Sequence, residues 1–373
     1  MTVNLSLAKE LADKVIDQEK VYVLDVRDKK SVEEWRIEGR NVEFINIPLD
    51  QLKEGGDSLL KELPKDEYFY AVCAKGNTSQ KAAKFLMEKG FTNVYSIEGG
   101  MEAWSEQLEP VKIGELKDGG SIFQFVRLGK GCLSYLIESN GEAIVVDASR
   151  MTETYEQFAQ QRNLKIVHVL DTHLHADHVS GGRKLAQQTG ATYYLPSEDA
   201  EEVVFEYEPI KDGKKLVIGS TTLEAVYSPG HTIGSTSFLV DDQYLLTGDI
   251  LFIESIGRPD LAGKAKDWAN DLYETLTMRY QKLANDLIVL PGHYAQVSEF
   301  NDNGSIFEKL GILYKNNRGL EIENEEKFIK QVTEGLKEQP NAYEEIRKTN
   351  MGKLSPGKQE LQEMETGPNN CAV

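Results

Sequence analysis

Cysteine and histidine are scarce in this chain, which has three of the first and six of the second among 373 residues. Three scattered cysteines, Cys73, Cys132 and Cys371, are too few for a disulfide framework and favour reduced thiols in a reducing compartment. No apolar run approaches the roughly 20 residues that span a bilayer. The N-terminus is amphipathic and contains acidic residues, unlike a signal or transit peptide. We therefore expect a cytoplasmic protein that does not enter a membrane.

Positive charge is also in short supply. Lysine and arginine number 42 against 61 aspartates and glutamates, which gives a net charge of -19. Such a surface is repelled by nucleic acid and by anionic membranes. The charge therefore argues for small-molecule partners and keeps the protein soluble.

The first hundred residues alternate strand-like and helix-like patterns, and at about 150 residues per domain the length predicts two domains. Alternation of this kind indicates a parallel α/β sheet. The β-rich runs are residues 21–26, 44–49, 68–73 and 93–97. The alternation of strand-like and helix-like patterns then ends in a stretch with proline and paired glycines. We expect a first domain over residues 1–107 and a linker over 108–120.

A second domain is expected over residues 121–338. Its first strands, residues 122–128, 132–139 and 142–147, are separated by glycine turns and predict an antiparallel meander. We interpret Cys132, inside the second of these strands, as structural. The polar stretch 339–373 is interrupted by proline and glycine and predicts an extended appendage.

Five of the six histidines lie in three short motifs, THLHADH, SPGHT and PGH, and TGD adds an aspartate. Each motif follows a strand-like run, so the four loops would bring their side chains to one edge of a sheet. Surface residues gathered by chance are the competing interpretation, and the recurrence at four strand ends argues against it. Imidazoles with carboxylates predict a metal centre. The side chains are His173, His175, Asp177, His178, His231, Asp249 and His293.

From these residues alone, a hydrolase with two metals is favoured. Seven ligands suffice for two Zn²⁺ ions that share Asp249, with a bridging hydroxide as nucleophile. The sixth histidine, His168, lies in the middle of a strand-like run and is expected to be a core residue.

The HxHxDH…H…D…H pattern resembles the metallo-β-lactamase superfamily over roughly residues 121–325. The resemblance implies an αββα sandwich with metal at one edge of the paired sheets. Within that superfamily, glyoxalase II, a thioester hydrolase, is the natural comparison for a two-zinc site.

The segment GDILFIESIGRPDL (248–261) resembles the persulfide dioxygenases. That resemblance implies one Fe(II) per chain, held by His173, His231 and Asp249. Two histidines and a carboxylate leave three positions of an octahedron open, enough for a persulfide and O₂. The other members of the set would orient these ligands by hydrogen bonds, or serve as alternative metal ligands. They are His175, Asp177, His178 and His293.

The same resemblance implies a substrate site. Arg258 would bind a carboxylate of the thiol carrier, with the competing interpretation that it is a surface arginine paired with Asp260. Tyr294 and Cys371 are the other candidates, since the terminal GPNNCAV resembles the end of these dioxygenases. Two departures concern this site: Ile256 stands where those enzymes have a cysteine, and Tyr294 follows His293 directly rather than two residues later.

Cys73 ends the strand YFYAVC and precedes AKGNTS and a helix. Backbone N–H groups of such a loop and the helix N-terminus favour a thiolate, and Lys75 adds positive charge for an anionic sulfur donor. The alternative is a small buried hydrophobe. The runs LDVR (24–27), CAKGNTS (73–79) and FTNVYSIEGGMEAW (91–104) resemble a rhodanese domain over residues 1–107. This resemblance implies that Cys73 carries sulfane sulfur and that Asp25 and Arg27 are structural.

Together the two resemblances predict a persulfide dioxygenase fused to a sulfurtransferase, because a rhodanese makes or consumes the persulfide that the iron site oxidises. The expected partners are a low-molecular-weight persulfide, thiosulfate or sulfite, and O₂; the carrier thiol is glutathione or another, such as coenzyme A. A homo-oligomer, dimer or tetramer, is expected. The alternatives are a zinc-dependent thioester hydrolase like glyoxalase II with an appended rhodanese, and a persulfide sensor without turnover.

Overall fold

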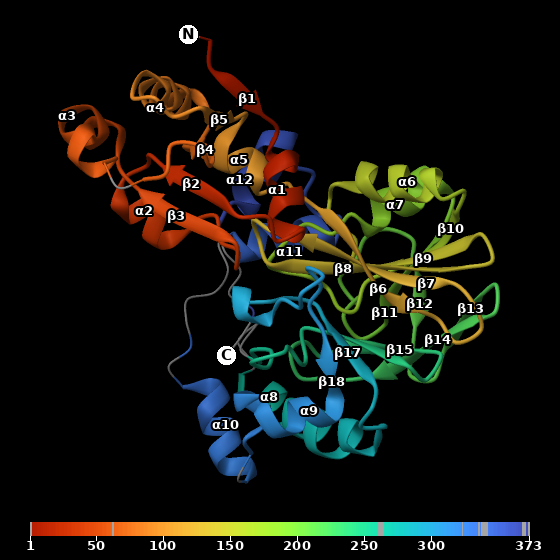
Figure 1. Cartoon of the computed structure of the whole chain (residues 1–373). Helices are drawn as coiled ribbons and strands as arrows, with labels where there is room; N and C mark the ends of the chain where they lie inside the picture. Colours follow the sequence, from red (N-terminus) through yellow and green to blue (C-terminus); the bar gives the residue numbers. More distant parts are fainter. Residues whose placement is uncertain are drawn as a thin grey trace.

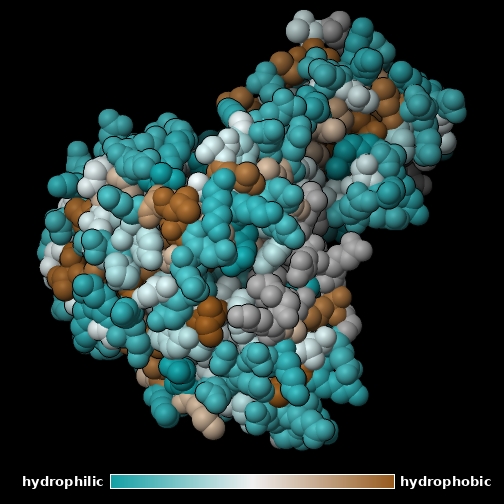
Figure 2. Space-filling model, turned by 180° about the vertical axis from the view of Figure 1, so that it is seen from behind, coloured by the Kyte–Doolittle hydropathy of each residue, from teal (hydrophilic) through white to brown (hydrophobic). Residues whose placement is uncertain are grey.

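The computed structural model describes residues 2–61, 63–259, 265–322, 324–334, 336, 342–367 and 371. Figure 1 shows a smaller red-to-orange α/β unit at the N-terminal end, beside a larger unit that continues to the blue C-terminal helices. Within the described residues, no helix is both long and apolar enough to cross a membrane. Figure 2 shows one face of the molecule, which is largely hydrophilic with small, separate hydrophobic patches.

The N-terminal unit is built on a five-stranded parallel sheet in the order β1-β5-β4-β2-β3, as the alternating sequence pattern predicts. Helices cover both faces of the sheet and bury two separate apolar clusters. The short edge strand β1 was not predicted. The elements are β1 (Asn4–Ser6), α1 (Ala8–Ile16), β2 (Val21–Asp25), α2 (Lys29–Glu34), β3 (Val42–Asn46), α3 (Leu49–Leu59), β4 (Tyr68–Val72), α4 (Asn77–Glu88), β5 (Asn93–Ile97) and α5 (Gly100–Trp104).

The second unit contains two sheets. The first has seven strands in the order β12-β11-β10-β9-β8-β7-β6, and its β7–β9 part is the predicted antiparallel meander. Its strands are β6 (Glu109–Glu115), β7 (Ser121–Arg127), β8 (Cys132–Ser139), β9 (Glu142–Val146), β10 (Lys165–Leu170), β11 (Thr192–Pro196) and β12 (Glu208–Ile210). The second has six, β13 (Lys215–Ile218), β14 (Thr221–Tyr227), β15 (Thr236–Val240), β16 (Tyr244–Gly248), β17 (Ile288–Pro291) and β18 (Glu308–Lys309), in that order.

Apolar side chains from both sheets, such as Ile137 and Phe238, form the central core between them. Helices α6 (Thr152–Gln161) and α7 (Gly182–Thr189) cover the outer face of the first sheet. The outer face of the second is covered by α8 (Ala265–Glu274), α9 (Leu310–Asn316) and α10 (Glu325–Thr333). The four layers are therefore helix, sheet, sheet and helix, and the predicted αββα sandwich is confirmed.

Three expectations about local structure are wrong. Much of the predicted linker 108–120 is strand β6, because its alternating residues pair with β7 and bury one face. The predicted extended appendage 339–373 contains two helices, α11 (Tyr343–Asn350) and α12 (Lys358–Glu365). Ile346 on α11 and Glu365 on α12 are buried. The helix that follows the first histidine motif begins at Gly182 rather than near His178.

The C-terminal helices lie where the two units meet, and Figure 1 shows the dark blue α12 beside the orange α5. Gln362 on α12 donates to the carbonyl oxygen of Glu102 on α5 at 3.3 Å. Glu365 at the end of α12 pairs with Arg127 on β7 through two contacts of 3.1 Å. The last part of the chain thus contacts both units.

Candidate functional site

Loops that follow β10, β14, β16 and β17 bring the predicted cluster together, as the four strand-end motifs predicted. All of its side chains are buried, each at most 4% exposed. The loop after β10 carries four of them and the other three loops carry one each: His173, His175, Asp177, His178, His231, Asp249 and His293. These residues lie in segments far apart in sequence, and the folding of the two sheets onto each other brings them together.

One subset has the composition of a metal site. Nε2 of His173 and Nε2 of His231 lie 3.8 and 3.5 Å from Oδ2 of Asp249. One ligand atom from each of the three lies within 4.8 Å of the other two. His173 Nε2 and Asp249 Oδ2 are buried and have no hydrogen-bond partner in the described part of the chain. Buried polar atoms are rarely left in this state, and a cation between them would satisfy both, so these residues fit a metal ion.

Hydrogen bonds on the far side of each ring fix the imidazole tautomers. His231 Nδ1 lies 2.9 Å from the carbonyl oxygen of Arg258, which can only accept, so Nδ1 carries the proton. Nε2 of His231 therefore has its lone pair free toward Asp249. Burial lowers the pKa of His173 and of His231, which keeps both rings neutral and able to bind a metal.

Asp147 organises the first loop, although it lies in none of the sequence motifs. It accepts from the backbone N–H and the hydroxyl of Thr172 at 2.7 and 3.0 Å. Since the Thr172 proton is used there, its oxygen accepts from His173 Nδ1 at 2.9 Å, which frees Nε2 of that ring. Asp147 also lies 3.1 Å from His175 Nε2. One carboxylate thus orients two histidines of the motif.

A second subset lies beside the first. His293 bridges two carboxylates, with Nδ1 2.6 Å from Asp249 Oδ1 and Nε2 3.0 Å from Asp177 Oδ2. His178 Nδ1 lies 3.1 Å from Asp177. Burial would lower the pKa of His178 and His293, but the neighbouring carboxylates outweigh it and hold both pKa values well above the usual range. The carboxylates therefore favour the protonated form of both rings.

Two cysteines face the same cluster. Cys132, predicted to be structural, lies with its sulfur 3.8 Å from Asp177 Oδ2 and close to His178 and His293. Burial would raise its pKa, but those two histidines lower the pKa of Cys132 to about 7. Cys371 is buried, and its sulfur lies within 4.8 Å of ligand atoms of Asp177, Asp249 and His293. The C-terminal cysteine is therefore brought to the cluster rather than left at a frayed end.

The other substrate-site candidates are placed differently. Arg258 is 1% exposed, so it is not a surface arginine, and Asp260, its suggested partner, lies outside the described residues. The backbone N–H of Arg258 donates to the carbonyl oxygen of Cys371 at 3.1 Å. The Tyr294 hydroxyl donates to the carbonyl oxygen of Leu128 at 3.2 Å, and its ring packs edge-on against Phe300. His168 stays outside the cluster, with its ring against Tyr194.

Cys73 lies at the end of β4, at the entrance to α4, where its loop forms a cradle. The backbone N–H of Ser79 donates to its sulfur at 3.3 Å, and Ser79 Oγ lies at 3.4 Å. Burial would raise the pKa of Cys73, but hydrogen bonds from Ser79 and from the backbone of Lys75 and Thr78 lower it below the usual value. The cradle therefore favours a thiolate at a site separate from the histidine cluster.

The residues around Cys73 have clear partners. Lys75 forms an exposed ion pair with Glu102 at 2.9 Å, so its charge lies next to the loop but is already paired. Asp25 and Arg27 contact each other through 2.7 and 3.0 Å bonds, and Arg27 also donates to the carbonyl oxygen of Trp35. This pair ties β2 to the turn that follows it.

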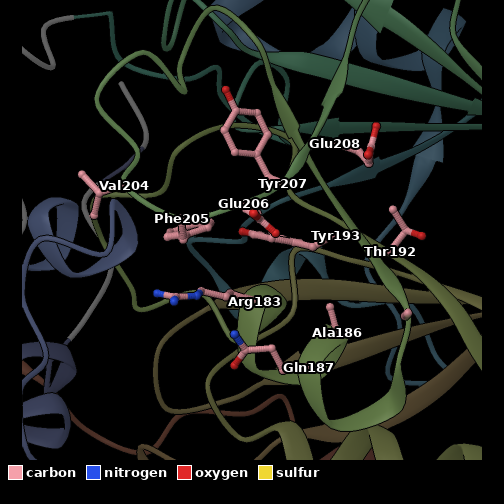
Figure 3. Close-up of a pocket in the computed structure, with 11 residues that line it drawn as sticks. Arg183, Ala186, Gln187, Thr192, Tyr193, Val204, Phe205, Glu206, Tyr207 and Glu208 are labelled. Carbon is pink, nitrogen blue, oxygen red and sulfur yellow. The ribbon is translucent and has the colours of Figure 1, made fainter.

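A separate hollow of about 550 Å³ lies on the outer side of the first sheet, between α7 and β12. In Figure 3 the Arg183 guanidinium faces the Phe205 ring, and the two are 4.3 Å apart. None of its eleven lining residues belongs to the histidine cluster or to the Cys73 loop. The hollow is therefore not the site that the motifs indicate.

Comparisons with known proteins divide the chain in the same way. Residues 7–107 match the family model of the rhodanese-like domain, and residues 128–293 match that of the metallo-beta-lactamase superfamily. A hydroxyacylglutathione hydrolase of Francisella tularensis subsp. novicida is 30% identical over 164 residues, 43% of this chain and 61% of that protein. The human mitochondrial persulfide dioxygenase ETHE1 is 29% identical over 154 residues, 41% of this chain and 59% of that protein. The crystal structure of a Staphylococcus aureus metallo-beta-lactamase covers 64% of this chain and 74% of its own, with 26% identity and a TM-score of 0.58.

Proposed function

Because the chain belongs to the metallo-beta-lactamase superfamily and carries a rhodanese-like domain ahead of that domain, we propose that it is a persulfide dioxygenase joined to a sulfurtransferase. The overall oxidation is RSSH + O₂ + H₂O → RSH + H₂SO₃. The second domain oxidises the persulfide, and the first exchanges sulfane sulfur with a low-molecular-weight thiol. The similarity to the human persulfide dioxygenase supports this assignment.

The observation that carries the proposal is the buried triad of His173, His231 and Asp249, in which Nε2 of both rings lies within 3.8 Å of Asp249 Oδ2. An Fe(II) ion held by these three side chains would leave three octahedral positions open and supply the redox chemistry with O₂. The protein's part is to keep the two rings in the Nδ1–H tautomer, through Thr172 and the Arg258 carbonyl oxygen. Burial excludes bulk water from the persulfide.

Residues behind the triad supply position and charge. Asp147 holds the loop of His173 and His175. His293 lies between Asp249 and Asp177, His178 pairs with Asp177, and both could hold a proton beside the bound carrier. Arg258 would bind an anionic group of the carrier. Cys371 and Tyr294 are further candidates for contact with the carrier.

Cys73 would carry out the sulfur exchange. Its thiolate attacks the outer sulfur of thiosulfate, the S–S bond breaks and sulfite leaves: Cys73–S⁻ + S₂O₃²⁻ → Cys73–SS⁻ + SO₃²⁻. A thiol then takes the outer sulfur, giving RSSH and the free thiolate. The loop N–H groups that face the sulfur stabilise the negative charge at each stage, and Lys75 attracts the anionic donor.

Metal content and oxygen uptake test the assignment. Protein made in iron-replete medium should contain one iron per chain and consume oxygen with glutathione persulfide, releasing sulfite. His173→Ala should lose both the iron and the uptake, because it removes a metal ligand. His168→Ala is the matched control, since that histidine lies five residues earlier, outside the cluster. Two zinc ions per chain without oxygen uptake would refute the dioxygenase.

The second candidate is a zinc-dependent thioester hydrolase. It is favoured by the closeness of Asp177 and His293 to Asp249, with His178 beside Asp177, which offers ligands for a second metal. The similarity to the hydroxyacylglutathione hydrolase also favours it. Turnover of S-lactoylglutathione by the zinc-loaded protein, with no activity on persulfide, would establish it instead.

A further inference from the structure

Side chains from α11 and α12 bind the backbone of the loop that carries four of the candidate metal ligands. Asn350, the last residue of α11, donates from Nδ2 to the carbonyl oxygens of His175 and His178, both at 2.9 Å. Its Oδ1 accepts from the backbone N–H of Ser180 at 2.9 Å. Glu365, the last residue of α12, accepts from the N–H of Val179 at 2.8 Å. Two side chains thus satisfy four backbone groups within six residues.

These bonds replace the partners that regular structure would provide. Between β10 and α7 the loop has no helix or strand ladder of its own, and residues 171–179 are buried. A buried backbone group without a partner destabilises the fold, so the loop needs such contacts to hold one conformation. Both ends of the Asn350 amide are in use, with donors facing carbonyls and the oxygen facing an N–H, which fixes the amide in one orientation.

The helix that presents Asn350 is itself held in place. Ile346 and Met351 are buried against the rest of the unit. The carbonyl oxygen of Met351 accepts from the N–H of Val204 at 3.0 Å, and Lys353 pairs with Glu202 at 2.9 Å. These contacts hold Asn350 in a fixed position relative to the loop.

A third contact reaches another ligand. The carbonyl oxygen of Cys371 accepts from the N–H of Arg258, and the carbonyl oxygen of Arg258 in turn accepts from His231 Nδ1. The C-terminal segment therefore supports both the first histidine loop and the anchor of His231. All of these supports lie beyond residue 293, where the superfamily match ends.

We propose that Asn350, assisted by Glu365, is a positioning residue of the metal centre, so that α11 and α12 complete a site whose histidine and aspartate ligands all lie earlier in the chain. Asn350 does not ligate the metal; it fixes the backbone from which His175, Asp177 and His178 project. The inference rests on the proposed function only in requiring that the cluster bind a metal.

Metal affinity, measured without any turnover, tests this role. Wild type, Asn350→Ala, Asn350→Asp and Thr349→Ala would be titrated with Co(II) and with Zn(II) against a chelator of known affinity. We expect a 10- to 100-fold loss of affinity in Asn350→Ala. Asn350→Asp has nearly the same size but would put one acceptor oxygen in the place of Nδ2, facing two carbonyl oxygens, so its loss should be at least as large. Thr349→Ala, whose hydroxyl bonds only within α11, should bind like wild type.

The outcomes separate the possible failures. Circular dichroism and a cooperative thermal transition in each variant show that the whole chain has folded. Equal metal affinity in all four proteins would overturn the positioning role, and so would a smaller loss in Asn350→Asp than in Asn350→Ala, because that ranking would indicate filled space rather than hydrogen bonding. If wild type binds no metal, the proposed function fails instead. Hydrogen exchange in the metal-free protein then still tests the positioning role of Asn350. The Val179 and Ser180 amides should exchange faster in Asn350→Ala than in wild type. Unchanged exchange would contradict the proposal.

Discussion

At the scale of single residues, Cys73 shows how the backbone sets the chemistry of one atom. Its sulfur is buried, yet loop N–H groups and Ser79 lower its pKa, which favours the thiolate more than in an ordinary cysteine. We expect Cys73→Ser to abolish thiosulfate–thiol sulfur transfer and to leave oxygen uptake on added persulfide within about twofold of wild type, because the two sites use separate residues. A folded Cys73→Ser protein that loses both activities would contradict this separation.

The histidine cluster was predictable from sequence, and its surroundings were not. His173, His231 and Asp249 lie in motifs at strand ends, where local pattern indicates both the turn and the direction of the side chain. The sequence predicts a structural role for Cys132 and not its place beside the histidine cluster. Every residue of β8 is buried, so no alternation distinguishes side chains that face the core from those that face the cluster. Asn350 bonds to residues more than 170 positions earlier, and no local pattern reports such a contact.

At the scale of elements, α12 depends on one buried carboxylate. Glu365 is fully buried between Arg127 and Arg150 and accepts from Val179. Burial would raise its pKa, but the two guanidinium groups lower the pKa of Glu365 to about 2. Because the folded pKa lies below the unfolded value near 4.3, the ionised group stabilises the fold above about pH 4.3. That contribution, about 3 kcal/mol in full, is lost as the pH falls toward 2.

Glu365→Gln should therefore lower the free energy of unfolding by about 3 kcal/mol at pH 7. The difference from wild type should shrink by roughly 2 kcal/mol between pH 6 and pH 3, since wild type loses the ionic contribution there and the variant has none to lose. Denaturant unfolding at several pH values measures both. Glu363→Gln, on the exposed side of the same helix, serves as the control. A pH-independent difference would show that the Glu365 charge adds nothing to stability.

The secondary-structure predictions that are wrong have a common cause. The sequence predicts a linker at strand β6 because Pro110 and Gly114 lie within it, and only pairing with β7 makes it a strand. Helices α11 and α12 are short and polar, with few apolar positions to mark them, and their stability derives from contacts such as Glu365 with Arg127. Short elements held by distant partners carry too little periodic pattern to be recognised along the chain.

At the scale of the whole molecule, buried polar contacts join the two units. Arg127, fully buried, donates to the carbonyl oxygen of Ser105 at 2.8 Å, and the Trp35 indole donates to the carbonyl oxygen of Gly129 at 2.9 Å. Lys9 on α1 pairs with Glu109 on β6 at 2.7 Å. Contacts of this kind lose their partners when one unit unfolds alone. The two units should therefore unfold together.

Metal binding provides a way to observe this coupling from the opposite end of the molecule. A ligand that binds only the folded state stabilises it by about 4 kcal/mol at a thousand-fold excess over its Kd. The chain has three tryptophans, and in Trp268→Phe the remaining two, Trp35 and Trp104, both report on the N-terminal unit. Saturating metal should raise the midpoint of their thermal transition, even though the candidate ligands all belong to the other unit, and His173→Ala in the same background should abolish the shift. The metal could instead stabilise the second unit and leave the midpoint of the N-terminal transition unchanged. That result would mean that the contacts through Arg127 and Trp35 are too weak to make the two units one cooperative structure.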